Sequence, residues 1–183
     1  HPDDLNRASW QMWLNAVKRD YEKLLREWRQ VYVLGESMGA LLALQLAAQH
    51  PEIPGVILFA PALKVKRLWL ARLLSPFMQY LQKGGDDDGL PWKGYTVYPV
   101  KAAVQLLKLQ KHTRNVLEKI HQPLLVVTGA HDTTIAPESA GVILDGVNSV
   151  EKQHLHLKQS AHCIMLDKEL EQAFQAVLEF VKE

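Results

Sequence analysis

One short motif offers the chain a nucleophile. Residues 35–39 read Gly-Glu-Ser-Met-Gly, a Gly-x-Ser-x-Gly pattern between a predicted strand (31–34) and a predicted helix (38–50). Such a junction holds its serine on a sharp, strained turn that exposes the hydroxyl. The helix also begins with free N–H groups, which can donate to an oxyanion. The motif therefore predicts Ser37 as nucleophile and the Met38 N–H as oxyanion-hole donor, against the alternative of a glycine-flanked turn that serves only packing.

A serine needs a base before it can attack, and His162 is the best placed of the eight histidines. It follows the last predicted strand (150–157), where parallel sheets place their sites. The base needs an acid that fixes its tautomer, and Asp132 follows the predicted strand 124–128. Taken singly, the two are also interpreted as a surface-loop histidine and a turn-forming aspartate. Together with Ser37 they occupy successive strand ends in the order Ser, Asp, His, which indicates a catalytic triad.

These residues must be positioned by a sheet, and hydrophobic periodicity predicts one. Helical spacing of apolar residues predicts helices at 9–29, 38–50, 100–120, 137–144 and 168–182, and short apolar runs predict strands at 31–34, 56–59, 124–128 and 150–157. Residues 38–50 have almost no polar face, which is typical of a buried helix. Ser9 and Asp167 are predicted N-caps. The alternation predicts an α/β fold: a mostly parallel sheet with helices on both faces and its last strand near an edge.

Composition indicates one domain over residues 1–183 and argues against several classes of protein. Nearly half of the residues are apolar and the net charge is +1, so no strong field favours nucleic acid. We expect no transmembrane segment, because no apolar run approaches the roughly 18 residues needed to span a bilayer, and we expect no signal peptide. The single cysteine, Cys163, excludes an intrachain disulfide and favours a reducing, cytoplasmic setting.

Two clusters of possible metal ligands occur in the sequence, and neither has the complete ligand pattern of a metal site. The aspartates at 86–88 lack the alternating oxygen ligands of a calcium loop and are interpreted as part of a solvated loop. His154 and His156 share one face of a predicted strand, but no third ligand is evident. We therefore expect no metal and no cofactor.

Along nearly the whole chain, the sequence resembles the bacterial carboxylesterase and monoacylglycerol-lipase branch of the α/β-hydrolases. The segments that carry the resemblance are Ser9-Trp10-x-x-Trp13-Leu14, Leu34-Gly35-Glu36-Ser37-Met38-Gly39-Ala40, Ile120-x-x-Pro123-Leu124-Leu125-Val126-Val127-x-Gly129-x-x-Asp132, Ile135-x-Pro137, and Ser160-Ala161-His162 followed by Leu166-Asp167. The resemblance implies the α/β-hydrolase fold and a cap formed by residues 63–99 over an acyl pocket. It also implies a two-step mechanism, in which Ser37 is acylated and water activated through His162 then attacks.

The chain departs from that family at its start. Family members carry several strands before the first helix seen here, with a loop that supplies a second oxyanion donor, and nothing before Ser9 matches them. The resemblance therefore implies the C-terminal two-thirds of the usual fold. We expect the remaining strands in a preceding segment or a separate chain, or their place taken by another copy of this chain. Loss of one oxyanion donor typically costs about 10²–10³ in rate.

Three functions remain open from the sequence. The first is a serine hydrolase that cleaves carboxylic esters, short- or medium-chain esters or monoacylglycerols, through an acyl-enzyme on Ser37. The second is a non-catalytic binding module that keeps the fold without the full oxyanion hole. The third keeps the fold and cleaves thioesters or amides. The sequence assigns no residue to substrate binding.

Overall fold

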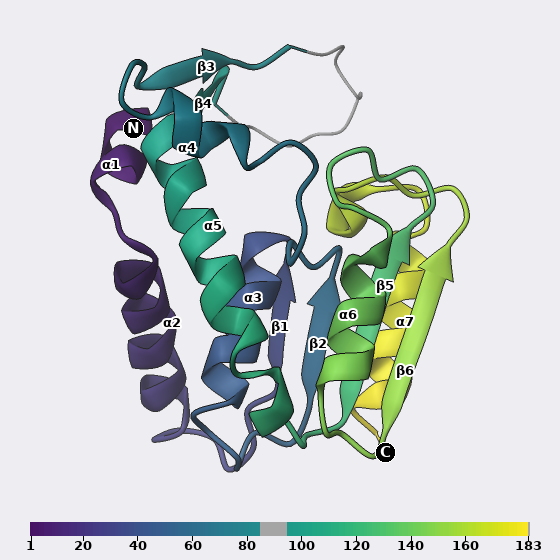
Figure 1. The fold of residues 1–183 in the computed structure, drawn as a ribbon. Coiled ribbons are helices and arrows are strands. Elements are labelled where there is room, and N and C mark those ends of the chain that lie inside the picture. The colour runs from purple at the N-terminus through teal and green to yellow at the C-terminus, as the bar shows by residue number, and fades with distance from the viewer. Residues whose placement is uncertain (85–94, 183) are drawn as a thin grey trace.

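The computed structural model describes residues 1–84 and 95–182, in which the strands form a four-stranded sheet and a separate two-stranded pair (Figure 1). The described strands are β1 (Val33–Glu36), β2 (Val56–Phe59), β3 (Tyr80–Gln82), β4 (Val97–Pro99), β5 (Leu124–Gly129) and β6 (Lys152–Leu157). The described α-helices are α1 (Pro2–Arg7), α2 (Trp10–Leu24), α3 (Met38–Ala47), α4 (Leu70–Leu74), α5 (Val100–Arg114), α6 (Glu138–Gly146) and α7 (Leu170–Phe180).

The main sheet has the order β1-β2-β5-β6, and every neighbouring pair is parallel. All four strands therefore end at the same edge, at the top of Figure 1. The predicted parallel α/β sheet is confirmed, and so is the edge position of the last strand. This arrangement brings together the segments that follow β1, β5 and β6, although they are distant in sequence.

Helices cover both faces of the sheet. One face packs against α7, where Leu125 and Val127 join Phe180 in a buried cluster. On the other face Leu124 and Val126 belong to the core shared with α2, α3 and α6. The central strand β5 is thus buried on both sides, as its unbroken apolar sequence predicts. Within the described residues, no helix combines the length and apolarity needed to cross a membrane.

The ends of α2 and α7 agree with the predicted helix ends at one position and differ at others. The predicted N-cap is confirmed, because the Ser9 hydroxyl accepts a hydrogen bond from the Met12 N–H at 3.3 Å. The helix stops at Leu24 rather than at residue 29, since no residue after Tyr21 in this segment is buried against a neighbour. The predicted N-cap at Asp167 is wrong: α7 begins three residues later, behind Glu169.

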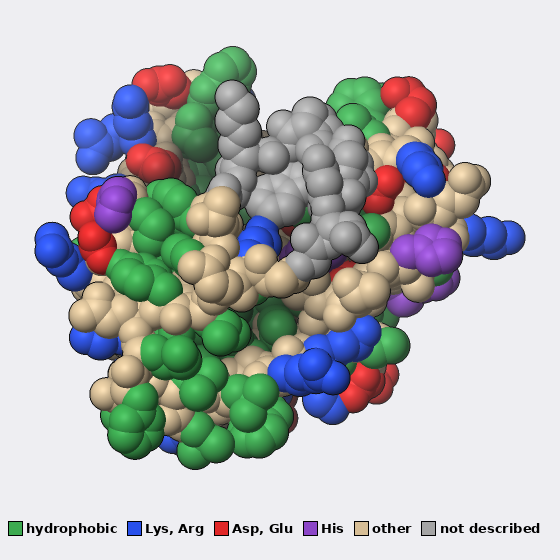
Figure 2. All heavy atoms as spheres, turned by 90° about the horizontal axis from the view of Figure 1, so that it is seen from above, with side chains coloured by type: hydrophobic (Ala, Val, Ile, Leu, Met, Phe, Trp, Pro, Cys, Tyr) green, Lys and Arg blue, Asp and Glu red, His purple; other side chains and the backbone are tan. Residues whose placement is uncertain are grey.

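The described parts of segment 63–99, residues 63–84 and 95–99, lie beyond the carboxyl ends of the strands (Figure 1). They hold α4 and the antiparallel pair β3–β4. Large apolar side chains are exposed here, with Phe77 88% exposed and Trp69 60%. On the face of the molecule that lies at the top of Figure 1, hydrophobic side chains gather along one margin (Figure 2). Residues 86–88 are not among the described residues, and the role of 63–99 as a cap stays a prediction.

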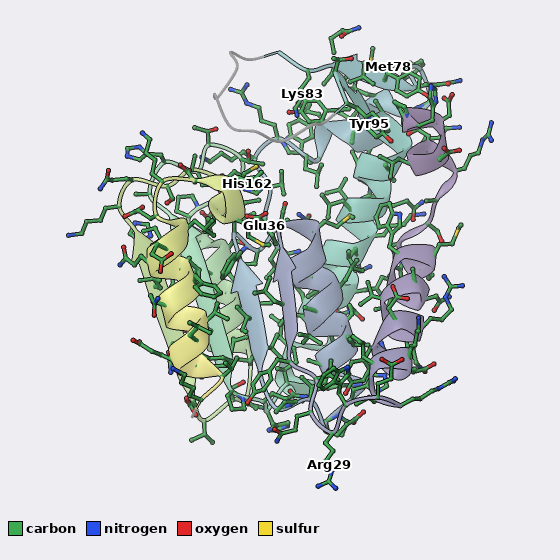
Figure 3. The ribbon with its side chains drawn as sticks, turned by 180° about the vertical axis from the view of Figure 1, so that it is seen from behind. Arg29, Glu36, Met78, Lys83, Tyr95 and His162 are labelled. Atoms are coloured by element: carbon green, nitrogen blue, oxygen red, sulfur yellow. The ribbon has the colours of Figure 1, made fainter. Side chains whose placement is uncertain are left out.

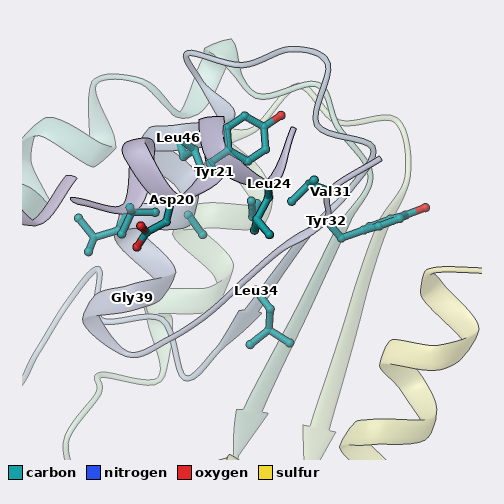
Figure 4. A pocket seen from close by; sticks show the side chains of 12 residues that line it. Asp20, Tyr21, Leu24, Val31, Tyr32, Leu34, Gly39 and Leu46 are labelled. Atoms are coloured by element: carbon teal, nitrogen blue, oxygen red, sulfur yellow. The ribbon is translucent and has the colours of Figure 1, made fainter. Parts of the chain in front are cut away.

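Strand β1 borders an apolar groove. Among the described residues β1 pairs only with β2, so its other edge carries unpaired backbone groups. A groove of about 280 Å³ runs along this edge between α2 and α3 (Figure 4). The residues that line it are mostly apolar: Val17, Asp20, Tyr21, Leu24, Val31, Tyr32, Val33, Leu34, Gly39, Leu42, Ala43 and Leu46.

We predict that self-association of this chain depends on that groove. Leu34 is 43% exposed on β1, so Leu34→Lys places a charge on the open edge and should shift the chain toward monomer. Sedimentation velocity over a concentration series measures the effect. Val150→Lys, at a fully exposed position remote from the groove, is the matched control. If the unmodified chain is already monomeric at high concentration, the groove drives no self-association.

Candidate active site

Ser37 lies on a strained turn between β1 and α3. Its φ of 55° and ψ of −114° fall in a region that residues other than glycine rarely adopt. Two backbone hydrogen bonds hold the turn: the Ser37 N–H donates to Phe59 O at 2.8 Å, and the Ala62 N–H donates to Ser37 O at 3.1 Å. A Cβ at Gly35 would lie 2.3 Å from the Gly39 carbonyl oxygen, so only glycine fits there.

The second glycine of the motif is not required in the same way. Among the described residues, nothing lies within 4 Å of a Cβ built on Gly39, which borders the groove beside β1. Close approach of strand and helix therefore requires glycine at position 35 and not at position 39. Met38 follows Ser37 as the first residue of α3, and N–H groups of a first turn have no partner within the helix. Its N–H stays the predicted oxyanion donor.

The structure brings Ser37, His162 and Asp132 together in one hydrogen-bonded chain. His162 Nε2 lies 3.0 Å from Ser37 Oγ, and His162 Nδ1 lies 2.8 Å from Asp132 Oδ2. Because an ionised carboxylate only accepts, Nδ1 carries the proton and Nε2 is left to accept the serine hydroxyl. The Asp132 side chain is 9% exposed and the His162 side chain 23%, so the pair is largely shielded while the imidazole keeps access to the surface.

Asp132 is held in its ionised form by its own loop. Its Oδ1 accepts hydrogen bonds from the N–H groups of Thr134 at 2.7 Å and Ile135 at 2.9 Å, while Oδ2 faces His162. Burial by itself raises the pKa of Asp132, but the hydrogen bonds from His162, Ile135 and Thr134 outweigh it and the pKa is lowered. The carboxylate therefore keeps its charge and can stabilise an imidazolium.

The acid loop and the histidine loop touch backbone to backbone. A Cβ at Gly129 would lie 2.4 Å from the carbonyl oxygens of both Ser160 and Ala161. The His131 N–H donates to Ser160 O at 3.0 Å across the same contact. Glycine at the end of β5 thus lets the loop that carries Asp132 approach the loop that carries His162.

The histidine loop is also held by two acidic residues that precede α7. The Glu169 carboxylate accepts hydrogen bonds from the Gln159 N–H at 2.8 Å and the Ser160 hydroxyl at 2.7 Å. Asp167 Oδ2 accepts from the Ala161 N–H at 2.6 Å, directly before His162. Sequence reasoning missed both roles. The sequence predicts Asp167 as an N-cap and includes it among the segments that carry the resemblance, and it predicts no role for Glu169.

The first residues of segment 63–99 are tied to the acid loop. Val65 and Ile135 form an isolated antiparallel bridge. The Lys66 N–H donates to Thr134 O at 3.0 Å, and the Ala136 N–H donates to Lys64 O at 2.8 Å. The loop that presents Asp132 is therefore braced on its other side by the chain that leads into α4.

His154 and His156 lie elsewhere, on the exposed edge strand β6. The predicted shared face is confirmed, since His154 Nε2 and His156 Nδ1 each lie 2.9 Å from Thr128 Oγ1. Burial and the neighbouring His156 lower the pKa of His154. Over residues 1–84 and 95–182, no three His, Cys, Asp or Glu side chains group closely enough to hold a metal ion.

Comparison with known proteins finds lipases and esterases. Residues 7–89 match the family model described as "Serine aminopeptidase, S33". The chain is 28% identical over 184 residues to the thermostable monoacylglycerol lipase of Bacillus sp. (strain H-257), covering 98% of this chain and 74% of that protein. It is 29% identical over 188 residues to a carboxylesterase of Bacillus subtilis (strain 168), covering 100% and 76%.

Solved structures share the fold. One, from a study of the metagenome-derived lipolytic enzymes LipS and LipT, superposes with a TM-score of 0.93 at 23% identity, covering 100% of this chain and 77% of that one. At this level of identity the likeness establishes the architecture. It places the turn after β1 and the loops after β5 and β6 in the arrangement of the α/β-hydrolase fold.

The Gly129 contact predicts that two glycine-to-alanine substitutions have opposite effects on stability. Gly129→Ala forces a Cβ into two carbonyl oxygens and should destabilise the chain by about 1–3 kcal/mol. Gly141→Ala, in α6, has nothing within 4 Å among the described residues and should stabilise by about 0.5–1 kcal/mol. Urea unfolding measures both. Equal stability of the two variants would contradict the close loop contact.

The lowered pKa of Asp132 predicts a pH-dependent stability. A carboxyl group whose folded pKa lies below its unfolded value, about 3.9, stabilises the fold above that value and loses the effect as pH falls through the folded pKa. Asp132→Asn should therefore be less stable than the unmodified chain at neutral pH, with the gap closing below about pH 4. Urea unfolding at several pH values tests this, with Asp145→Asn, exposed on α6, as the control. A gap that stays constant with pH would contradict it.

Proposed function

We propose that this chain is an α/β-hydrolase and, more narrowly, a serine hydrolase that cleaves carboxylic esters. One observation carries the proposal. The imidazole of His162 lies within hydrogen-bond reach of both the Ser37 hydroxyl, at 3.0 Å, and the Asp132 carboxylate, at 2.8 Å. A nucleophile, a base and an orienting acid in that order are what acyl transfer requires.

The proposed reaction has two halves. As Ser37 Oγ attacks the ester carbonyl, its proton passes to His162 Nε2 and the carbonyl oxygen becomes an oxyanion facing the Met38 N–H. Collapse of this intermediate breaks the carbon–oxygen bond, and His162 returns the proton to the departing alcohol. Water then loses a proton to His162 and attacks the acyl group on Ser37. The carboxylic acid leaves and the serine recovers its proton.

The names of the relatives indicate the class of substrate. They are a monoacylglycerol lipase and a carboxylesterase, so we propose a small ester, either a short- or medium-chain ester or a monoacylglycerol. The matching family model has an aminopeptidase description, which keeps amide cleavage as the second candidate. We further propose that residues 63–99 cover the acyl group. The cytoplasmic setting predicted from a single cysteine stays a prediction.

A non-catalytic binding module is not favoured. Such a module gains nothing from a strained serine, and backbone strain of this kind typically costs about 1–3 kcal/mol. Nor does it need a buried carboxylate that orients an imidazole toward the hydroxyl. The assembled geometry of Ser37, His162 and Asp132 therefore supports catalysis over binding alone.

The direct test is covalent labelling. The purified chain should react with a fluorophosphonate probe and hydrolyse p-nitrophenyl butyrate, and Ser37→Ala should lose both. His162→Ala should lower kcat/KM by about 10⁴-fold or more, because no other group takes the serine proton. Ser149→Ala is the matched control: its hydroxyl is buried in the loop between α6 and β6 and has no partner among the described residues.

The outcomes separate the candidates. Ester turnover that exceeds hydrolysis of an aminoacyl p-nitroanilide supports the esterase proposal, and the reverse supports amide cleavage. A panel of monoacylglycerols and p-nitrophenyl esters of increasing chain length ranks the acyl groups. A folded chain that neither labels nor turns over any of these substrates would falsify the proposed function.

A further inference from the structure

The residue between Gly35 and Ser37 makes a contact that the Gly-x-Ser-x-Gly pattern does not require. Glu36 ends β1 and is half-buried. Its Oε1 accepts a hydrogen bond from the Met165 N–H at 3.3 Å, across 129 positions of sequence. Met165 belongs to a short 3₁₀ turn, Ile164–Leu166, that follows His162. One side chain thus joins the strand that ends at the nucleophile to the loop that carries the base.

This contact differs in kind from the other anchors of the histidine loop. Glu169 and Asp167 hold the loop onto itself and the start of α7, and Gly129 lets it touch the acid loop. Glu36 ties it to β1. Because Glu36 and Ser37 are adjacent in the chain, that tie fixes His162 relative to Ser37 rather than relative to Asp132.

The same carboxylate lies close enough to His162 to act on its charge. Figure 3 shows Glu36 and His162 together at the carboxyl end of the sheet. Burial raises the pKa of Glu36, and the bond from Met165 and the charge of His162 partly oppose that shift. No lysine or arginine in the described part of the chain forms an ion pair with Glu36. A half-buried carboxylate without a cation is costly, so the position does not favour glutamate for stability alone.

We propose that Glu36 is a positioning residue, whose carboxylate ties the histidine loop to the nucleophile strand and supports the imidazolium that forms on His162. The proposal rests on the proposed function, in which His162 becomes positive as Ser37 attacks. Three other charges surround this centre: Asp132 on Nδ1, Asp167 bound to the neighbouring Ala161 N–H, and Lys66, whose ammonium donates to Asp132 O at 3.4 Å. Glu36 adds a negative charge on the β1 side.

Three substitutions separate the tie from the charge. Glu36→Gln keeps an acceptor for Met165 and removes the charge. Glu36→Asp keeps the charge and shortens the reach. Glu36→Ala removes both. Glu22→Gln, exposed on α2, is the matched control. Each variant is assayed for kcat and KM on an ester from pH 5 to 9, with thermal unfolding to confirm that it folds.

The expected results differ for each variant. Glu36→Ala should lower kcat about tenfold with KM nearly unchanged, because an orienting contact for the base is lost. Glu36→Gln should move the acid limb of the kcat/KM profile to lower pH by about half a unit, since the imidazolium loses a favourable charge. Glu36→Asp should lower kcat and leave the acid limb in place. If Glu36→Ala does not fold, the Gln and Asp variants carry the test.

A hydrogen-exchange measurement that needs no turnover separates failure of this proposal from failure of the proposed function. The Met165 N–H should exchange faster in Glu36→Ala than in the unmodified chain, whether or not the chain hydrolyses esters, because its acceptor is lost. Loss of kcat without any movement of the acid limb in Glu36→Gln would reduce Glu36 to a structural contact and overturn the proposal. Unchanged kcat and exchange rate in all three variants would overturn it as well.

Discussion

The strained backbone of Ser37 is the constraint on which the site depends. A serine at φ 55° and ψ −114° is unfavourable in an isolated chain, by about 1–3 kcal/mol, and persists only where its surroundings leave no alternative. In this structure the surroundings of Ser37 hold its backbone in that conformation. The turn is clamped by hydrogen bonds to Phe59 and Ala62, and α3 behind it is buried from Ala40 to Ala47. Relaxing the turn would withdraw a whole helix from the core.

The parallel sheet turns this local strain into a site. Because β1, β5 and β6 end at one edge, the three loops that follow them meet without long excursions. Each loop must also be held in place, and the structure does this with short contacts of different kinds. Asp132 is held by two backbone N–H groups, the histidine loop by two carboxylates, and the two loops meet where Gly129 leaves room. Each contact restricts the movement of one loop relative to its neighbours.

Much of this was predictable from the sequence, for identifiable reasons. The strands were, since β2 and β5 are continuous apolar runs, and the buried α3 was, since it lacks a polar face. Ser37, Asp132 and His162 were predictable as a set because each follows a strand in a recognisable motif. Residues that act through tertiary contacts gave no such signal. Glu36 occupies a position that the motif leaves free, and Glu169 owes its role to a turn whose shape the sequence does not encode locally.

The bridge between Val65 and Ile135 has a consequence for the modular design of the molecule. Residues 64 to 66 are joined by a β-bridge and backbone hydrogen bonds to the loop that presents Asp132. They are therefore fixed to the sheet rather than to the residues that follow them. The first residue after these contacts is Arg67, whose positive φ of 58° marks a sharp change in the direction of the chain. The contacts that hold the Asp132 loop therefore end at Lys66, before the chain turns. The fold accordingly constrains the length and composition of this segment less from Arg67 onward than at residues 64 to 66.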